Sequence, residues 1–179
     1  METMKTIANR QSCRAYSGEQ LNDNELQTIV MAANAAPKGS RPGTNLEVRL
    51  TVIQNSELLS KIDHAAADLF KIPNFKPSYG APTVIFVHVT IPEDKQDLTS
   101  YCNAACAAEN MVLAATDLGL GNVYLTSIIV ALNRNKELCS ELKVPEGFMP
   151  AAAIAVGKSG IPLAERELTL SNIVTEYIK

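Results

Sequence analysis

A short cationic segment near the N-terminus carries the side chains best suited to bind an anion. Arg10 and Arg14 flank Gln11, Ser12 and Cys13 in the order Arg-Gln-Ser-Cys-Arg. A guanidinium can hold a phosphate through two parallel hydrogen bonds, and a serine hydroxyl adds a neutral donor. The segment therefore predicts a phosphate site, unless Arg10 only caps the last carbonyl groups of a short preceding helix. Ser12 and Arg14 lie beyond such a cap and are not explained by it.

The composition is that of a globular protein without a strong charge bias. The 179 residues are 46% hydrophobic and 20% charged, with a formal net charge of -3. This length fits one domain, and the charge provides no basic field for nucleic acid or an anionic membrane. No stretch approaches the roughly 20 apolar residues of a membrane span, and the first nine residues lack the apolar core of a signal peptide. We expect a soluble cytoplasmic protein with no nucleic acid or membrane partner.

The cysteines and histidines do not form a metal-binding pattern. Cys102 and Cys106 share a helix face, but the chain has no CxxC motif and only two histidines, His64 and His88. We therefore expect no metal site, and small buried thiols in a packed helix face. His88 lies within an apolar run and is expected to be a hydrogen-bonded structural residue, with a catalytic base as the alternative.

Helix and strand signals are mixed along the chain and favour an α+β sandwich. Asn22 and Glu25 form a capping box before an apolar stripe that ends at Pro37. The run 83–89 is almost continuously apolar and β-branched, as in a strand buried on both faces. Helices are expected at 2–9, 22–36, 55–69, 99–118, 133–142 and 170–178, and strands at 47–53, 83–89, 121–125 and 150–156.

The pattern Gly119-Leu-Gly121 is not a dinucleotide-binding fingerprint. That fingerprint follows a strand and opens a helix, whereas these glycines end a helix and open a strand. Gly119 instead suits the left-handed position just past a helix end.

Several motifs, in their order along the chain, resemble the nitroreductase-like FMN-dependent oxidoreductases. They are the 10–14 segment, the capped helix ending at Pro37 with a polar loop after it, Tyr79-Gly-Ala-Pro82 before a buried strand, Asn110-Met111 in an Ala-rich helix running into Leu118-Gly-Leu-Gly121, and Val144-Pro-Glu-Gly147 before a last strand. Their shared order extends over almost the whole chain and carries the resemblance. The resemblance implies one FMN-binding domain, residues 1–179, with a mixed central sheet of four or five strands packed by helices. It also implies a homodimer with FMN at the interface.

The resemblance also assigns residues to the cofactor. Arg10 and Ser12 would hold the phosphate and ribityl chain with Arg166 as a second phosphate ligand, while Gln11 stands where the family usually has another arginine. Arg14 would lie at the N1–C2 edge of the flavin, where a fixed cation favours the reduced form. The family segment that passes the reactive edge of the ring corresponds to Leu125, Thr126 and Ser127.

The polar loop 38–45 is expected to contact the FMN held mainly by the other chain. Lys38 and Ser40 belong to it, and Arg41 and Asn45 are the two candidates for the position of a family asparagine.

The implied activity is ping-pong hydride transfer from NADH or NADPH through flavin N5 to a nitroaromatic, quinone or enone. No obligatory catalytic residue of the protein is expected, because the chemistry belongs to the flavin. The alternative within flavin chemistry is a specialised reductase or a flavin-fragmenting enzyme, and the alternative from another class is a non-enzymatic flavin-binding or storage protein of the same fold. A hydrolase built on Ser40 with His64 or His88 is a distant alternative, since the chain has no nucleophile-elbow motif.

Overall fold

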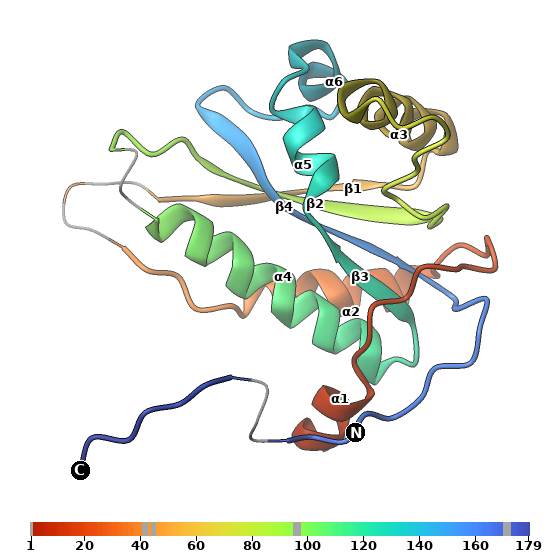
Figure 1. Cartoon of the computed structure of the whole chain (residues 1–179). Helices are drawn as coiled ribbons and strands as arrows, with labels where there is room; N and C mark the ends of the chain where they lie inside the picture. The colour runs from red at the N-terminus through yellow and green to blue at the C-terminus, as the bar shows by residue number, and fades with distance from the viewer. Residues whose placement is uncertain (1, 41–42, 44–45, 95–97, 170–172) are drawn as a thin grey trace.

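An apolar segment in the middle of the chain forms the strand around which the sheet is built. In strand β2 (Thr83–Thr90) every residue except the last is buried. This strand pairs with β1 (Val48–Ile53) on one side and with β4 (Phe148–Gly157) on the other, and β3 (Gly121–Leu125) pairs with the far side of β4. The strand order is therefore β1-β2-β4-β3 (Figure 1).

The computed structural model describes residues 2–40, 43, 46–94, 98–169 and 173–179. Its four strands agree with the predicted number, but all three strand pairs are antiparallel, in contrast to the expected mixed sheet. Strands β2 and β3 do run in the same direction, but β4 lies between them and so they are not neighbours. Within the described ranges, parallel pairing is confined to an isolated bridge between Ser12 and Asn122.

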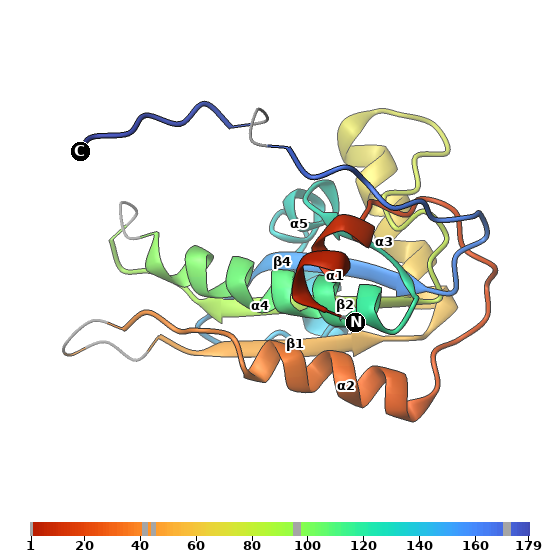
Figure 2. The same cartoon turned by 90° about the horizontal axis from the view of Figure 1, so that it is seen from below.

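Helices cover both faces of the sheet, and alternation along β2 assigns its side chains to one face or the other. One face packs under α2 (Asp23–Asn34) and α4 (Thr99–Asp117), with Ile85, Val87 and Val89 turned toward them. The opposite face packs under α3 (Ser56–Phe70), α5 (Ser127–Leu132) and α6 (Lys136–Glu141), with Val84 and Phe86 turned toward them. Figures 1 and 2 show these two layers, and the short helix α1 (Thr3–Asn9) near one end of α4.

The predicted capping box at the start of α2 is present. The Glu25 backbone N–H donates to Asn22 Oδ1 at 3.0 Å, and the Asn22 backbone N–H donates to Glu25 Oε2 at 2.9 Å. The Lys158 ammonium donates to the other oxygen of Glu25, which ties the segment after β4 to the first turn of α2. The same carboxylate therefore fixes both the helix start and the beginning of the C-terminal segment.

Helix α4 ends as its sequence predicts. Gly119 has a φ of +76°, and the backbone N–H of Leu120 donates to Ala115 O across the turn. This left-handed turn satisfies carbonyl groups at the helix end and directs the chain into β3. No helix in the described part of the chain is long and apolar enough to cross a membrane.

Two expectations about local structure are wrong, and one short helix was missed. The apolar residues after β3 form a separate short helix, α5, where no helix was predicted, because six residues are too few to show helical periodicity. On α4, Cys102 is exposed and Cys106 half-buried, so the expected buried pair of thiols is absent. The predicted last helix, 170–178, is also absent over residues 173–178, where the apolar side chains are exposed; residues 170–172 lie outside the described part. Short helices gain most of their stability by packing an apolar face, and these side chains are not packed against the chain.

His88 is fully buried in β2 and has the predicted structural role. Its Nε2 lies 2.9 Å from Thr51 Oγ1 on β1, and its Nδ1 has no hydrogen-bond partner among the described residues. Burial lowers the pKa of His88 from 6.5 to about 4, because the charged imidazolium would lose its hydration.

This pKa predicts a measurable pH dependence of stability. The folded pKa lies below the unfolded one, so protonation favours the unfolded chain; the stability is complete above pH 6.5 and is lost as the pH falls toward about 4. This residue alone should lower the free energy of unfolding by about 2 kcal/mol between about pH 7.5 and about pH 5, as measured with urea.

The matched control is His88→Asn, compared with the wild type by the slope of stability against pH. Carboxylates titrate in both proteins, so the difference between the slopes isolates the histidine. Equal slopes in the two proteins would contradict the prediction.

Candidate functional site

The 10–14 segment is attached to the free edge of strand β3. Ser12 bridges Asn122 in parallel, and the backbone N–H of Cys13 donates to Asn122 O at 2.8 Å. Cys13 is buried, whereas its neighbours Ser12 and Arg14 are exposed, as expected where adjacent side chains of an extended segment alternate. The two candidate ligand residues therefore share the solvent side of the segment.

This attachment requires a glycine at the start of β3. A Cβ atom at Gly121 would lie 2.6 Å from Cys13 Sγ and 3.0 Å from Cys13 Cβ. Distances this short do not occur between packed carbon and sulfur atoms, so any side chain at Gly121 would push the 10–14 segment away from the strand. Gly121 thus has a packing role that the sequence pattern alone did not identify.

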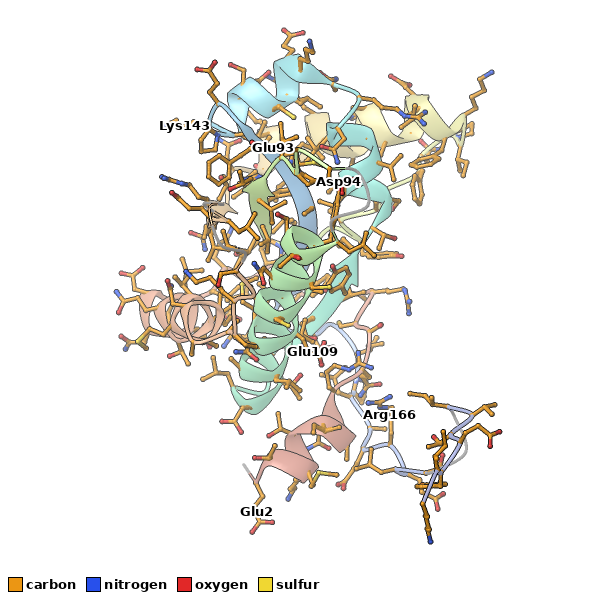
Figure 3. All side chains as sticks on the ribbon, turned by 90° about the vertical axis from the view of Figure 1, so that its left-hand side faces the viewer. Glu2, Glu93, Asp94, Glu109, Lys143 and Arg166 are labelled. Carbon is orange, nitrogen blue, oxygen red and sulfur yellow. The ribbon has the colours of Figure 1, made fainter. Side chains whose placement is uncertain are left out.

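The C-terminal segment reaches the same region from the other end of the chain. The backbone N–H of Arg166 donates to Ala8 O at 2.9 Å, and its Nη2 donates to Ile7 O at 3.0 Å. The Gln11 side chain donates to Ala164 O at 3.0 Å. Two segments about 150 residues apart in sequence therefore lie side by side, and Figure 3 shows Arg166 near α1.

These contacts give Arg10 and Arg166 different roles at the end of α1. The residue is the C-cap of α1, but it acts through its backbone N–H, which donates to Thr6 O at 3.0 Å. The guanidinium that reaches a carbonyl group at the end of α1 belongs to Arg166. The helix-capping role of a cationic side chain thus falls to Arg166, while the half-buried Arg10 lies at the start of the segment attached to β3.

The remaining candidate residues lie at two other places. Leu125 ends β3, and Thr126 and Ser127 follow it at the start of α5; Leu125 therefore lies about 13 Å from Gly121, at the opposite end of the strand to which the 10–14 segment is attached. Lys38 and Ser40 flank Gly39, which exchanges two hydrogen bonds with the buried Asn103 side chain of α4, at 2.7 and 3.0 Å. Arg41 and Asn45 lie outside the described residues.

Helix α4 separates the loop at Gly39 from the attached segment. Gly39 is held at the first turns of the helix, beside Thr99 and Asn103, whereas Cys13 lies against Gly121 beyond its last turn. From Asn103 to Asp117 the helix rises by about 20 Å. Within one chain, therefore, Lys38 and Ser40 lie away from the 10–14 segment that carries the predicted phosphate ligands. Sequence reasoning missed Asn103, although a polar residue on the buried face of an apolar helix was a visible signal.

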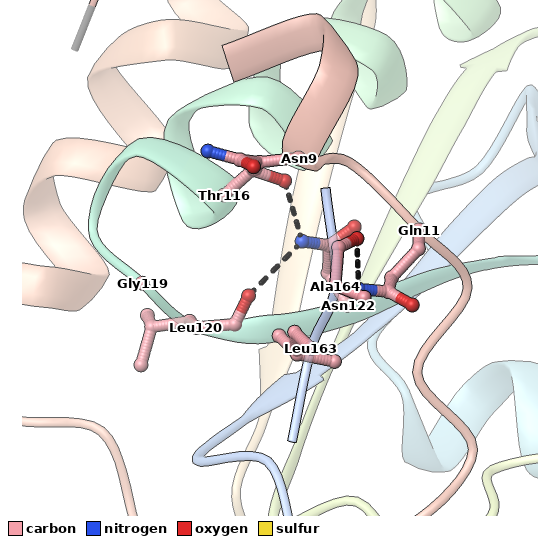
Figure 4. Close-up of a pocket in the computed structure, with 8 residues that line it drawn as sticks. All are labelled: Asn9, Gln11, Thr116, Gly119, Leu120, Asn122, Leu163 and Ala164. Atoms are coloured by element: carbon pink, nitrogen blue, oxygen red, sulfur yellow. Dashed lines mark hydrogen bonds between the residues drawn. The ribbon is translucent and has the colours of Figure 1, made fainter. Parts of the chain in front are cut away.

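A cavity of about 230 Å³ lies behind the attached segment (Figure 4). Its lining is uncharged and comes from Asn9, Gln11, Thr116, Gly119, Leu120, Asn122, Leu163 and Ala164. The Asn122 amide donates to Thr116 Oγ1 and Leu120 O, and its buried Oδ1 has no hydrogen-bond partner among the described residues. Since no charged side chain among the described residues lines this cavity, the cavity itself is not the predicted anion site.

Arg14 contacts an aromatic ring from another part of the chain. Its Cζ lies 5.7 Å from the centroid of Tyr79, within the range of a cation–π interaction. The guanidinium is thus placed over a ring that belongs to the connection between α3 and β2.

The two histidines do not combine with Ser40. His64 Nδ1 lies 2.7 Å from Ser60 O within α3, and His88 is paired with Thr51 in the sheet. The geometry gives no support to a serine hydrolase. In the described part of the chain, no group of three or more His, Cys, Asp or Glu residues is placed to hold a metal ion.

Comparison with known protein families gives an extended match. The model of the nitroreductase family matches residues 7–158. An FMN reductase (NADPH) of Bacillus subtilis is 27% identical over 169 residues, an alignment that covers 87% of this chain and 65% of that protein.

Solved structures resemble the chain over nearly its whole length. A nitroreductase with bound FMN from Bacteroides fragilis is 27% identical, with a TM-score of 0.80, and the match covers 99% of this chain and 100% of that one. A nitroreductase with bound FMN from Desulfitobacterium hafniense is 25% identical, with a TM-score of 0.83, covering 100% and 99% of the two chains.

Proposed function

Because this chain belongs to the nitroreductase family, we propose that it is an FMN-dependent oxidoreductase that uses NAD(P)H to reduce an electron-poor acceptor. The supporting observation is the attachment of the 10–14 segment to β3, which leaves Arg14 and Ser12 exposed beside the C-terminal segment that carries Arg166. We further propose that residues 1–179 act as one FMN-binding domain.

The residues at this edge fit a molecule with a phosphate at one end and a flat polar-edged ring at the other. Arg10 and Ser12 would bind the phosphate, because charge-assisted hydrogen bonds to phosphate are short and strong. Arg166 would add a second cation; it uses one N–H to bind Ile7 O, and a guanidinium has five. Gln11 is neutral, and its amide instead holds the C-terminal segment in place through Ala164 O.

The remaining proposed contacts concern the flavin ring. When bound, FMN supplies two-electron chemistry, accepting a hydride from NADH or NADPH and passing it to a nitroaromatic, quinone or enone in a ping-pong cycle. Arg14 would stabilise the negative charge of the reduced flavin and thereby raise its potential. The chain would pass the ring at Leu125, Thr126 and Ser127, with no obligatory acid or base from the protein.

We propose that the active unit is a homodimer. Lys38 and Ser40 flank Gly39 at the first turns of α4, whereas the 10–14 segment lies beyond its last turn, about 20 Å away; this separation supports a site in which these loop residues contact FMN held by another chain. The C-terminal residues Ile173, Val174, Tyr177 and Ile178 expose apolar side chains that a second chain can cover.

The dimer is checked by light scattering at micromolar concentration. The expected mass is twice the 19.3 kDa of one chain. A mass of one chain, with FMN bound, would contradict the proposal that two chains complete the site.

The proposed location is the cytoplasm. Cys13, Cys102, Cys106 and Cys139 are all free thiols, as is usual in a reducing compartment, and NAD(P)H is available there. Cell fractionation that finds the protein elsewhere would contradict this location.

Cofactor uptake and reduction test the function directly. The purified protein should be yellow or should bind added FMN, and anaerobic NADH or NADPH, added in separate samples, should bleach the bound flavin. A colourless protein that takes up no FMN would overturn the proposal. FMN binding without bleaching by either donor would favour a flavin-binding protein without reductase activity.

Two substitutions test the division of roles between the arginines. Arg10→Ala should weaken binding of oxidised FMN by about ten- to hundredfold, the effect of losing a charge-assisted hydrogen bond of about 1.5–3 kcal/mol. Arg14→Ala should in addition lower the midpoint potential of bound FMN. Fluorescence titration and spectroelectrochemistry measure the two quantities. Losses of thermal stability alone, with binding and potential unchanged, would assign both residues a purely structural role.

A further inference from the structure

Tyr79 occupies a backbone conformation that bulky residues rarely adopt. Its φ is +56°, and the following Gly80 has a φ of +70°. The Ala81 N–H donates to Ser78 O at 3.1 Å, which closes a four-residue turn around them. Two consecutive positive φ angles in such a turn favour glycine, asparagine or aspartate. A tyrosine here costs conformational free energy, and strain of this kind is often found where a side chain has a functional task.

A buried carboxylate on a different element holds this turn. Asp63 of α3 is 7% exposed, and its Oδ1 accepts a hydrogen bond from the Ser78 N–H at 3.0 Å. Its Oδ2 accepts one from the Ser78 hydroxyl at 2.6 Å, and Gly80 N–H donates to the same hydroxyl at 3.3 Å. Hydrogen bonds to a charged acceptor are strong, so the surrounding structure compensates for the strain at Tyr79.

The turn places the Tyr79 ring against Arg14, whose own backbone is also fixed. The guanidinium carbon lies 5.7 Å from the ring centroid. The residue before Arg14, Cys13, is held on β3 by its backbone N–H. The carbonyl oxygen of Cys13 also accepts a hydrogen bond at 3.1 Å from the hydroxyl of Tyr16, which lies two residues after Arg14. The contact thus joins two anchored segments, although both side chains are exposed.

We propose that Tyr79 is a positioning residue for Arg14: the strained turn holds its ring so that the guanidinium stays at the flavin end of the site. The proposal rests on the proposed function, because its consequence appears in bound FMN. Without the ring, the long Arg14 side chain would spread over several rotamers in water. Its average stabilisation of the reduced flavin would then fall, while phosphate binding by Arg10 and Ser12 would not change.

The test compares the affinity of the protein for oxidised FMN with its affinity for reduced FMN. Fluorescence titration gives the affinity for oxidised FMN, and the midpoint potentials of bound and free flavin then give the affinity for reduced FMN. Tyr79→Leu should lower the preference for reduced over oxidised FMN by about two- to fivefold, the ratio that a cation–π contact at an exposed site provides. The affinity for oxidised FMN should remain near that of the wild type. In an Arg14→Ala background, Tyr79→Leu should have no further effect.

Two controls separate the ring from other properties of the site. Tyr79→Phe keeps the ring and should behave as the wild type. Phe148→Leu removes the other cation–π contact of the described chain, with Arg49 at 5.2 Å, and should leave the preference unchanged. Phe148 and Gly157 are the two ends of β4, so Phe148 lies about 30 Å along the sheet from the site region.

Tyr79→Gly provides a second variant if the leucine variant does not fold. Glycine adopts positive φ without strain, so this variant should keep or gain thermal stability while it loses the same two- to fivefold preference. Equal preferences in the wild type and either folded variant would overturn the positioning role, as would additive effects of Tyr79→Leu and Arg14→Ala.

A measurement without FMN tests the contact between Arg14 and Tyr79 independently of the proposed function. In NMR spectra of the flavin-free protein, the Arg14 side-chain signals should show a ring-current shift that is lost in Tyr79→Leu and kept in Tyr79→Phe. No such shift in the wild type would overturn the contact itself. A wild type that shows the shift but binds no FMN would instead overturn the proposed function and leave the contact confirmed.

Discussion

The attachment of the 10–14 segment to β3 is the contact on which the candidate site depends. It consists of one parallel bridge, one backbone hydrogen bond and a close approach of Cys13 to Gly121 that only glycine permits. Because Cys13 points inward at that position, Ser12 and Arg14 face the solvent. The C-terminal segment then adds Arg166 to the same region through hydrogen bonds to α1. The segments that carry the cationic side chains are thus held by backbone contacts and buried packing within the chain.

Helix α4 packs in the core of one layer and also separates two groups of candidate ligands. Its first turns hold the loop at Gly39 through Asn103, and the turn after its last residue leads into the strand that holds the 10–14 segment. A rigid helix of 19 residues keeps these two groups of candidate ligands apart in one chain. Under the proposed function, this separation fits a homodimer in which each FMN draws its phosphate ligands from one chain and its loop contacts from the other.

The turn at Tyr79 shows how strain and compensation are divided between elements. The positive φ of Tyr79 is unfavourable for an aromatic residue, whereas the buried Asp63 carboxylate secures the preceding Ser78 by two hydrogen bonds. Burial raises the pKa of Asp63, and its hydrogen bonds with Ser78 oppose that shift. The bonds that hold the turn therefore also favour the charged form of the carboxylate. The contact between Arg14 and Tyr79 therefore depends on α3, an element that supplies none of the proposed ligands.

The sequence by itself determined the features that depend on neighbouring residues. The capping box at Asn22, the left-handed Gly119, the buried strand 83–89 and the four-strand count all follow from local propensity and periodicity, and the order of motifs indicated the family. The tertiary structure alone decided the antiparallel order, because β4 comes last in the chain and yet lies between β2 and β3. It also showed that the guanidinium of Arg166 reaches a carbonyl group of α1, to which Arg10 contributes its backbone N–H, and that residues 173–178 do not form a helix on this chain. These outcomes depend on contacts between residues that are far apart in sequence. The order of residues in one sequence does not give the distances between them in space.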